Sequence, residues 1–216
     1  MAKYYGGCDA GSTYTKCVIL DETGKIAANI TKRSRINPVL SAKDSLDEAV
    51  ALVDGLNSAD ELDYLIGTGY GRNKVPFADE NISEISCHAM GVHVAAPDVK
   101  AIIDIGGQDV KGIAIDTDGT VLNFSMNDKC AAGTGRFLEM MAKTMEMSLD
   151  ELSQVGLSYQ EDITISSMCT VFAESEVVSL IAQNKATDDI VHGLNKAVAV
   201  KTAALTRRVG GEEKYM

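Results

Sequence analysis

Two copies of one short pattern could bind phosphate and a metal ion. The segment from Asp9 to Asp21 recurs as the segment from Asp104 to Asp116, with Asp, Gly, Lys and a closing Asp at matching offsets. A turn that carries Gly11, Ser12 and Thr13 can direct backbone N–H groups and hydroxyls at phosphate oxygens, because small side chains permit close approach. A carboxylate at a strand end can hold Mg²⁺, usually through water, or orient an attacking water. The pattern therefore indicates a metal–nucleotide site.

Each copy contributes its own candidate residues. A single Asp-x-Gly turn can be merely structural, but two copies in register favour a binding role. The candidates for catalysis are Asp9, Asp104 and Gln108. The candidates for holding the nucleotide and Mg²⁺ are Gly11, Ser12, Thr13 and Lys16 in the first copy and Asp104, Gly106, Gly107 and Gln108 in the second. Lys16 would add a point charge.

Two of the five cysteines precede apolar helical patterns. Cys130 comes before a face that starts at Phe137, and Cys169 before one that starts at Val177. A thiolate at a helix start is stabilised by the macrodipole and by free N–H groups, by about 0.3 to 1 kcal/mol when exposed. Two thiolates are half of the set that holds a [4Fe-4S] cluster, and a symmetric homodimer would supply all four. The alternative is that both cysteines are inert, because buried Cys is common.

The other three cysteines are interpreted as packing residues. Cys8 and Cys17 flank the first turn in strand positions, and Cys87 lies in a helical run over residues 83–94. The five cysteines are an odd number, and in a reducing compartment thiols are more often buried, metal-binding or catalytic than paired as disulfides. No disulfide is therefore expected.

The repeat predicts the elements that position these residues. An apolar run before each turn and a β-rich run after it indicate two strands around a Gly-bearing turn, so each copy is expected to be a hairpin. Third strands over residues 26–31 and 121–125 and helical patterns follow. The chain therefore looks duplicated, with one lobe over residues 1–97 and a second over 98–216. We expect the two turns to face each other across a cleft.

Composition and charge argue against several classes of protein. The chain of 216 residues can form one large domain or two lobes. A net charge of −11 without a basic stripe argues against binding to nucleic acid. The N-terminus lacks the apolar core of a signal peptide, and no apolar run approaches the roughly 18 residues of a membrane span. A soluble, cytoplasmic protein without a membrane partner is expected.

Six motifs spread over the chain can now be taken together. They are Asp9-Ala-Gly-Ser-Thr13, Gly67-Thr-Gly-Tyr-Gly-Arg72, Ser86-Cys-His-Ala-Met-Gly91, Ile103-Asp-Ile-Gly-Gly-Gln-Asp109, Asn127-Asp-Lys-Cys-Ala-Ala-Gly-Thr-Gly-Arg136 and Cys169-Thr-Val-Phe-Ala-Glu-Ser-Glu176. In this set the chain resembles the activator component of 2-hydroxyacyl-CoA dehydratases, a family shared with the ATP-binding subunits of benzoyl-CoA reductase. The resemblance implies an α/β fold of the actin, sugar-kinase and Hsp70 type, with two ribonuclease-H-like lobes around a nucleotide.

The same resemblance implies an activity. Its ligands would be ATP or ADP with Mg²⁺ and one [4Fe-4S] cluster that bridges a homodimer, with Cys130 and Cys169 of each subunit matching the cluster ligands. A reduced ferredoxin or flavodoxin would load the cluster, and ATP would change the angle between the two cluster-bearing helices. A low-potential electron would then pass to the dehydratase or reductase component, and hydrolysis of ATP would reset the activator.

This chain differs from the family pattern in one respect, and two other functions remain open. In relatives an adenosine-binding segment follows the long helix, which is expected here over about residues 187–209, and this chain ends at Met216. A truncated chain that binds ATP more weakly is therefore expected, with apolar surface exposed beside that helix. The open alternatives are a non-redox kinase of the same fold and a binding scaffold without catalysis. The kinase alternative gives no reason for the two cysteines at helix starts.

Overall fold

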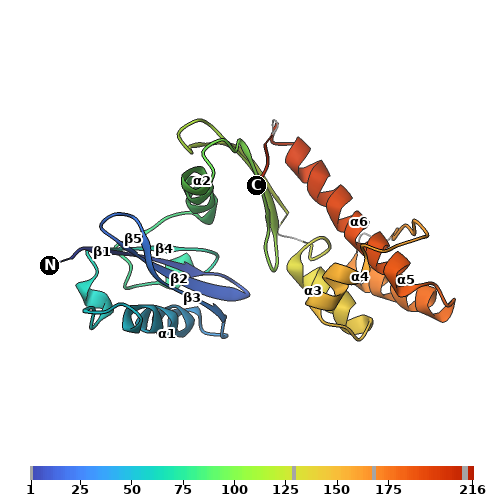
Figure 1. Ribbon diagram of the computed structural model, residues 1–216, viewed down its shortest axis with the longest axis horizontal. Helices are drawn as coiled ribbons and strands as arrows, with labels where there is room; N and C mark the ends of the chain where they lie inside the picture. The colour runs from blue at the N-terminus through green and yellow to red at the C-terminus, as the bar shows by residue number, and fades with distance from the viewer. Residues whose placement is uncertain (1, 128–129, 167–168, 211–213) are drawn as a thin grey trace. The chain divides into compact units, whose positions relative to one another are not determined.

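The computed structural model of the chain (Figure 1) describes residues 2–127, 130–166, 169–210 and 214–216. The chain divides into two compact units, residues 1–91 and 92–216. Helix α2 (Glu84–Ala95) runs through the point of division. Each unit is built around its own β-sheet.

The first unit contains a five-stranded sheet in the order β3-β2-β1-β4-β5. β1, β2 and β3 form an antiparallel meander, and β4 and β5 run parallel to β1. The strands are β1 (Tyr4–Ala10), β2 (Tyr14–Asp21), β3 (Ile26–Arg33), β4 (Tyr64–Thr68) and β5 (Glu80–Asn81), and the helices are α1 (Pro38–Ala51) and the short 3₁₀ turns η1 (Ala59–Glu61) and η2 (Arg72–Lys74). The predicted first hairpin and third strand are confirmed.

The core of this unit follows from the period of two in β1. Gly6, Cys8 and Ala10 point into the interior, which leaves Asp9 on the opposite face. Helix α1 covers the interior face of the sheet with residues that include Leu46. Cys8 is paired across the hairpin with Cys17, which is also buried, and their sulfurs are 3.2 Å apart. Both are free thiols that pack in the core, as predicted.

The second unit repeats the hairpin of the first in detail. β6 (Ala101–Ile105), β7 (Val110–Ile115) and β8 (Val121–Asn127) form an antiparallel sheet in that order. Asp104 faces Lys111 across this hairpin as Asp9 faces Lys16 across the first. The next strand pair of each unit, β2–β3 and β7–β8, also has a register shift at the matching place, between Ile19 and Leu20 and between Ala114 and Ile115. The duplication read from the sequence therefore extends to the backbone register.

Four helices complete the second unit. They are α3 (Gly135–Thr144), α4 (Leu149–Val155), α5 (Thr170–Ala182) and α6 (Thr187–Arg207). α3 and α5 pack against each other, and α6 lies on the sheet. Gly112 of β7 makes this close packing possible, because a Cβ atom there would be 3.1 Å from Cα of Thr206. The predicted long helix over residues 187–209 is confirmed as α6.

The last residues of the chain lie beside the free edge of β6. Ala101 forms a parallel bridge with Tyr215, and the Ile103 N–H donates to the carbonyl of Met216 at 2.8 Å. In the first unit, β1 and β4 are parallel neighbours in the same way, with Gly6 opposite Leu65. The position of Tyr215 beside β6 therefore matches that of β4 beside β1.

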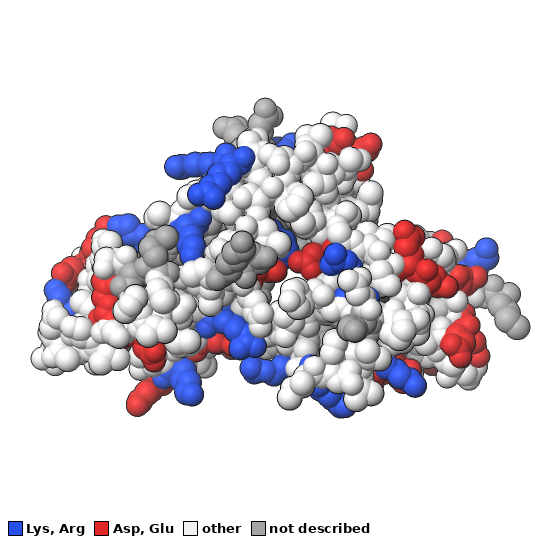
Figure 2. All heavy atoms as spheres, turned by 180° about the vertical axis from the view of Figure 1, so that it is seen from behind, with Lys and Arg blue, Asp and Glu red and all other residues white. Residues whose placement is uncertain are grey.

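Two general features concern the surface and the helices. Figure 2 shows acidic and basic side chains spread together over one face of the molecule. Within the described residues, no helix combines the length and apolar character that crossing a membrane would need.

Candidate functional site

The first turn joins β1 to β2 and carries a carboxylate next to an ammonium group. Asp9 Oδ2 accepts a hydrogen bond from Lys16 Nζ at 2.8 Å, because the two residues face each other across the hairpin. A Cβ atom on Gly11 would be 2.3 Å from the carbonyl oxygen of Tyr14, so this tight turn requires glycine. The predicted phosphate residues are thus grouped in one turn. Lys16 is half exposed and is paired with Asp9.

The segment that follows β4 closes onto the same strand end. The Gly71 N–H donates to the carbonyl of Ala10 at 2.8 Å. Gly69 has a φ of +88°, and a Cβ atom there would be 2.1 Å from Asp9 Oδ1. The sequence alone marks this Gly-rich segment only as a family motif. The structure shows that its glycines let the backbone approach the Asp9 carboxylate.

Two buried hydroxyl groups belong to the turn after β1 and to the end of β4. Thr13 lies in the first turn, and Thr68 is the parallel partner of Asp9 at the end of β4. Both Oγ1 atoms are buried, and neither has a hydrogen-bond partner in the part of the chain that the structure describes. Buried hydroxyls are normally hydrogen-bonded. These two groups, together with the Asp9 carboxylate and the glycine backbone, fit a ligand rich in oxygen such as a metal-bound phosphate.

The second turn has the same carboxylate and ammonium pair, with one more acid. Lys111 Nζ lies 3.0 Å from Asp104 Oδ2 and 2.7 Å from Asp109 Oδ1, and its side chain is only 4% exposed. Burial alone would lower the pKa of Lys111, but the hydrogen bond to Asp109 and the charge of Asp104 outweigh it, so the pKa is raised. Lys111 therefore stays charged and fixes both carboxylates. Asp109 was not a candidate from the sequence, since it has no counterpart in the first copy.

The second turn is tied directly to the start of α3. The N–H groups of Gly135 and Arg136 donate to the carbonyls of Gly106 and Gly107 at 2.9 and 3.0 Å. Gly106 and Gly107 are predicted phosphate residues, and α3 follows the Cys130 segment. A displacement of the turn would therefore move the first residues of α3. Gln108, in the same turn, is exposed.

Cys130 lies before a turn and not at the first residue of α3. Two features define this turn. The Thr134 hydroxyl donates to the Ala131 carbonyl at 2.6 Å, and Gly133 has a φ of +93°. The sequence placed both cysteines alike at helix starts. For Cys130 the difference has a physical reason, because the first N–H groups of α3 are bound to the second turn. A cation lies close instead, with Lys201 Nζ of α6 at 3.7 Å from Cys130 Sγ.

Cys169 is the N-cap residue of α5 and is exposed. Its position agrees with the predicted helix start. Glu176, in the second turn of α5, accepts hydrogen bonds at 3.1 Å from the backbone N–H of Ser166. Thr144 of α3 also donates to Glu174 of α5 at 3.2 Å, so the helices that follow the two cysteines are fixed to each other.

The side chains that could bind a metal can be compared with the four thiolates that a [4Fe-4S] cluster needs. No group of three or more Cys, His, Asp or Glu side chains that could hold a metal ion occurs in the described part of the chain. One chain offers Cys130 and Cys169, which is half of a four-thiolate shell. Cys17 is unsuited, since the hydrogen bond to Cys8 and burial raise the pKa of its thiol. The two thiols fit a cluster only as half of a set.

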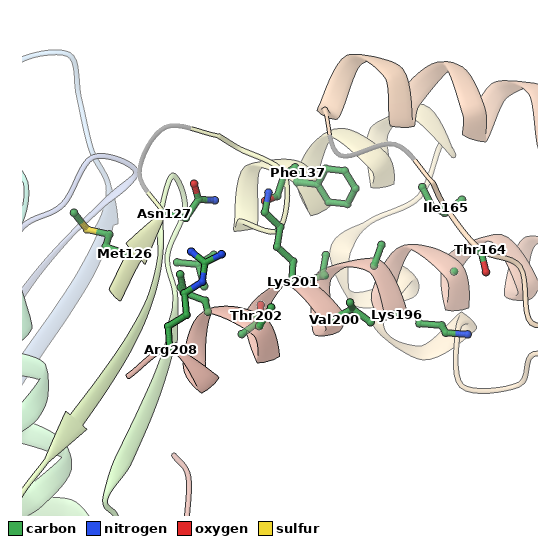
Figure 3. Close-up of a pocket in the computed structure, with 18 residues that line it drawn as sticks. Met126, Asn127, Phe137, Thr164, Ile165, Lys196, Val200, Lys201, Thr202 and Arg208 are labelled. Atoms are coloured by element: carbon green, nitrogen blue, oxygen red, sulfur yellow. The ribbon is translucent and has the colours of Figure 1, made fainter. Parts of the chain in front are cut away.

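A cavity of about 500 Å³ lies beside the Cys130 segment, between β8, α6 and the start of α3 (Figure 3). Its lining is mainly apolar and includes Phe137, Ile165 and Val200. Lys201 and Arg208 bring positive charge to this lining. Cys130 itself is half-buried beside this region.

Comparison with known proteins identifies relatives over nearly the whole chain. Residues 7–216 match the profile of the BadF/BadG/BcrA/BcrD ATPase family. The chain is 43% identical over 215 residues to the 2-hydroxyisocaproyl-CoA dehydratase activator of Clostridioides difficile, which covers 96% of this chain and 77% of that protein.

Solved structures agree with this match. The crystal structure of (R)-2-hydroxyglutaryl-CoA dehydratase component A from Acidaminococcus fermentans superposes with a TM-score of 0.92 at 40% identity, covering 99% of this chain and 81% of that one. The structure of the activator of the 2-hydroxyisocaproyl-CoA dehydratase from Clostridium difficile with bound ADPNP superposes with a TM-score of 0.90 at 42% identity. The match covers 100% of this chain and 78% of that one.

A more distant likeness concerns the fold alone. The structure of a N-acetylglucosamine kinase homologue from Chromobacterium violaceum superposes with a TM-score of 0.54 at 15% identity, covering 95% of this chain and 82% of that one. The predicted α/β class of actin and sugar-kinase type is confirmed. The chain belongs to the BadF/BadG/BcrA/BcrD ATPase family.

Proposed function

We propose that this protein is the ATP-dependent activator of a 2-hydroxyacyl-CoA dehydratase and passes single electrons to it. One observation carries the proposal: the carbonyls of Gly106 and Gly107 accept the N–H groups of Gly135 and Arg136. This contact joins a predicted phosphate turn to the helix that follows Cys130. A nucleotide-dependent change in the turn would therefore reach the residues that hold the redox group. The names of the similar proteins, which are dehydratase activators, support the same function.

The nucleotide half of the site uses the two turns. Asp9 and Asp104 would each offer carboxylate oxygens to Mg²⁺, directly or through water, because these are the ligands that Mg²⁺ prefers. The backbone and small side chains of Gly11, Ser12 and Thr13 in the first copy, and those of Gly106 and Gly107 in the second, face the phosphates. Lys16 and Lys111 keep the two carboxylates oriented through their ion pairs. Gln108 orients the water that attacks the γ-phosphate.

The redox half of the site uses the two cysteines. Cys130 and Cys169, with the same residues of a second copy, would hold a [4Fe-4S] cluster between two subunits. When bound, the cluster supplies one-electron chemistry at low potential. The exposed positions of α5 support this assembly, because Val171, Phe172 and Val178 are 62%, 67% and 52% exposed beside Cys169. Contiguous exposed apolar residues mark interaction surfaces.

The partners follow from the direction of electron flow. A reduced ferredoxin or flavodoxin delivers one electron to the activator, and the dehydratase, or a reductase of the benzoyl-CoA type, receives it. ATP hydrolysis at the two turns is coupled to this transfer through the contact with α3. The protein therefore acts as an ATPase whose output is the delivery of an electron, and the acyl-CoA chemistry takes place on the partner.

The test is reconstitution without oxygen. Purified protein is treated with iron and sulfide, and its visible and EPR spectra, iron content and ATPase rate are recorded beside a Cys130→Ala, Cys169→Ala variant. About four irons per dimer that disappear in the variant would support the proposal. A colourless wild-type protein that phosphorylates a small molecule would contradict it in favour of a kinase. If the protein binds no cluster and hydrolyses no ATP, the remaining alternative is a binding scaffold without catalysis.

A further inference from the structure

The two cysteines have different electrostatic surroundings. Cys169 is the N-cap residue of α5, so it lies at the positive end of that helix dipole. Cys130 does not cap a helix, and the N–H groups of Gly135 and Arg136 at the start of α3 donate to the second turn. Lys201 supplies positive charge in their place, at 3.7 Å from Cys130 Sγ.

We propose that Lys201 is a positioning residue for the redox site, which fixes the Cys130 turn and raises the reduction potential of the cluster. This inference rests on the proposed function, since it assigns a role towards the cluster. Similarity to known proteins shows the family and the fold of this chain but assigns no role to Lys201. Lys201 also lies outside the six sequence motifs.

The position of the Lys201 ammonium is fixed by three contacts with the Cys130 segment. Lys201 Nζ donates to the carbonyl of Ala132 at 2.6 Å and approaches Cys130 Sγ at 3.7 Å. Its aliphatic stem lies over Gly133, where a Cβ atom would be 3.2 Å from Lys201 Cδ. Figure 3 shows the side chain reaching from α6 towards the start of α3. The ammonium is therefore held beside the sulfur and is not a mobile surface charge.

The direction of the effect follows from charge. Reduction adds one electron, supplied by the donor protein, to a site that four thiolates already make negative. A positive charge near one thiolate stabilises the reduced form more than the oxidised form, because Coulomb attraction grows with the negative charge it meets. The site is half-buried, so this attraction is screened less than on the surface. Lys201 therefore makes loading by the donor easier.

A purely structural role would give a different result. Lys201 could serve only to hold the Ala132 carbonyl and thereby the turn. Lys201→Gln keeps an N–H donor but removes the charge, whereas Lys201→Arg keeps both. Lys196→Met is the matched control, because it removes a positive charge from the same helix and the same cavity, and Lys196 is paired with Asp162 instead of the cysteine.

The first measurement is a reductive titration of the reconstituted protein followed by EPR. Lys201→Gln is expected to lower the equilibrium constant for reduction by about tenfold, which is about 59 mV for one electron. Lys201→Arg and Lys196→Met are expected to stay near the wild-type potential. A Lys201→Gln protein with an unchanged potential, or one that shifts no more than Lys196→Met, would overturn the inference.

A second measurement works without the cluster and separates this inference from the proposed function. The rate at which iodoacetamide alkylates Cys130 in the metal-free protein at one fixed pH is compared with the rate for Cys169 by mass spectrometry. Because Lys201 lies against Cys130 Sγ and holds the Ala132 carbonyl, Lys201→Gln should change the rate at Cys130 severalfold and leave the rate at Cys169 unchanged. An equal change at both cysteines, or no change at either, would overturn the role of Lys201. A wild-type chain that binds no cluster would overturn the proposed function and the redox part of the inference, whatever the alkylation rates.

Discussion

Gly69 shows how a single residue can determine the shape of the first turn. Its φ of +88° would cost an alanine about 1–2 kcal/mol. A Cβ atom would also lie 2.1 Å from Asp9 Oδ1, so the carboxylate would have to move. We expect Gly69→Ala to lower both the free energy of unfolding and the affinity for ADP, measured by urea denaturation and by calorimetry.

Gly24 provides the matched control for this change. It has a similar φ of +82°, and nothing lies within 4 Å of the position that its Cβ atom would take. Gly24→Ala should therefore show the cost of backbone strain without a change in nucleotide affinity. If the two variants bind ADP equally well, the Asp9 carboxylate is not part of the nucleotide site.

The duplicated hairpin offers a second comparison at the residue scale. Lys111 is buried between Asp104 and Asp109, while Lys16 beside Asp9 is half exposed. Removing one partner of a buried pair leaves uncompensated charge, so Lys111→Met should lower the free energy of unfolding by about 3 kcal/mol. Lys16→Met should cost less than about 1 kcal/mol, because solvent screens an exposed pair.

Chemical denaturation of both variants at neutral pH measures this difference. Lys111→Arg, which keeps the charge, should recover part of the lost stability. Equal losses for Lys16→Met and Lys111→Met would show that burial does not distinguish the two ion pairs, and the second turn would then be no more rigid than the first.

At the scale of elements, the hairpins could be predicted from the sequence because they are local. The Asp-x-Gly turns, the β-rich runs and the long α6 pattern all depend on residues near in the chain, and each is found where it was expected. The contacts of Lys201 with Cys130 and of Gly135 with Gly106 could not be predicted, because they join distant parts of the chain through packing. The three alternate glycines at positions 67, 69 and 71 are the sequence signal of close backbone approach in this segment.

The start of α6 is joined to the loop between α4 and α5 by one carboxylate. Asp189 Oδ1 accepts the N–H groups of Gln160 and Glu161 at 2.7 and 2.8 Å. The hydrogen bonds from Glu161 and Gln160 lower the pKa of Asp189. A lowered pKa in the folded state means that the stabilisation is present above the ordinary value of about 4 and is lost as the pH falls through the folded value.

Asp189→Asn should therefore reduce stability at pH 7, and the difference from the wild type should shrink in acid. Asparagine can still accept a hydrogen bond but carries no charge. Thermal unfolding from pH 7 to pH 3 measures the difference. Asp188→Asn removes a charge from the same turn of the same helix, and it should show little pH-dependent difference from the wild type. A difference for Asp189→Asn that grows as the pH falls would contradict the assignment.

At the scale of the whole molecule, the second unit contains features that the first lacks. Both units have the hairpin, but α3, α4 and α5 are inserted between β8 and α6 of the second unit only. This insertion contains the predicted redox residues and an exposed apolar face on α5. The second turn and the start of α3 are joined through Gly135 and Arg136. The duplication thus supplies two like turns, each with a carboxylate paired to a lysine, and the insertion follows only the second of them.

The apolar face of α5 leads to a prediction about assembly. Phe172 is 67% exposed, three residues after Cys169, and Val171 and Val178 are exposed nearby. If a second copy covers this face, Phe172→Asp buries a charge without a partner and should weaken the dimer by about tenfold or more, since each factor of ten corresponds to about 1.4 kcal/mol. Leu52→Asp, at a position that is 61% exposed at the end of α1, is the control. Sedimentation equilibrium of the reconstituted proteins measures the dissociation constants. A Phe172→Asp protein that remains as dimeric as the wild type, or a Leu52→Asp protein that dissociates instead, would place the interface elsewhere and remove the support that α5 gives to a bridging cluster.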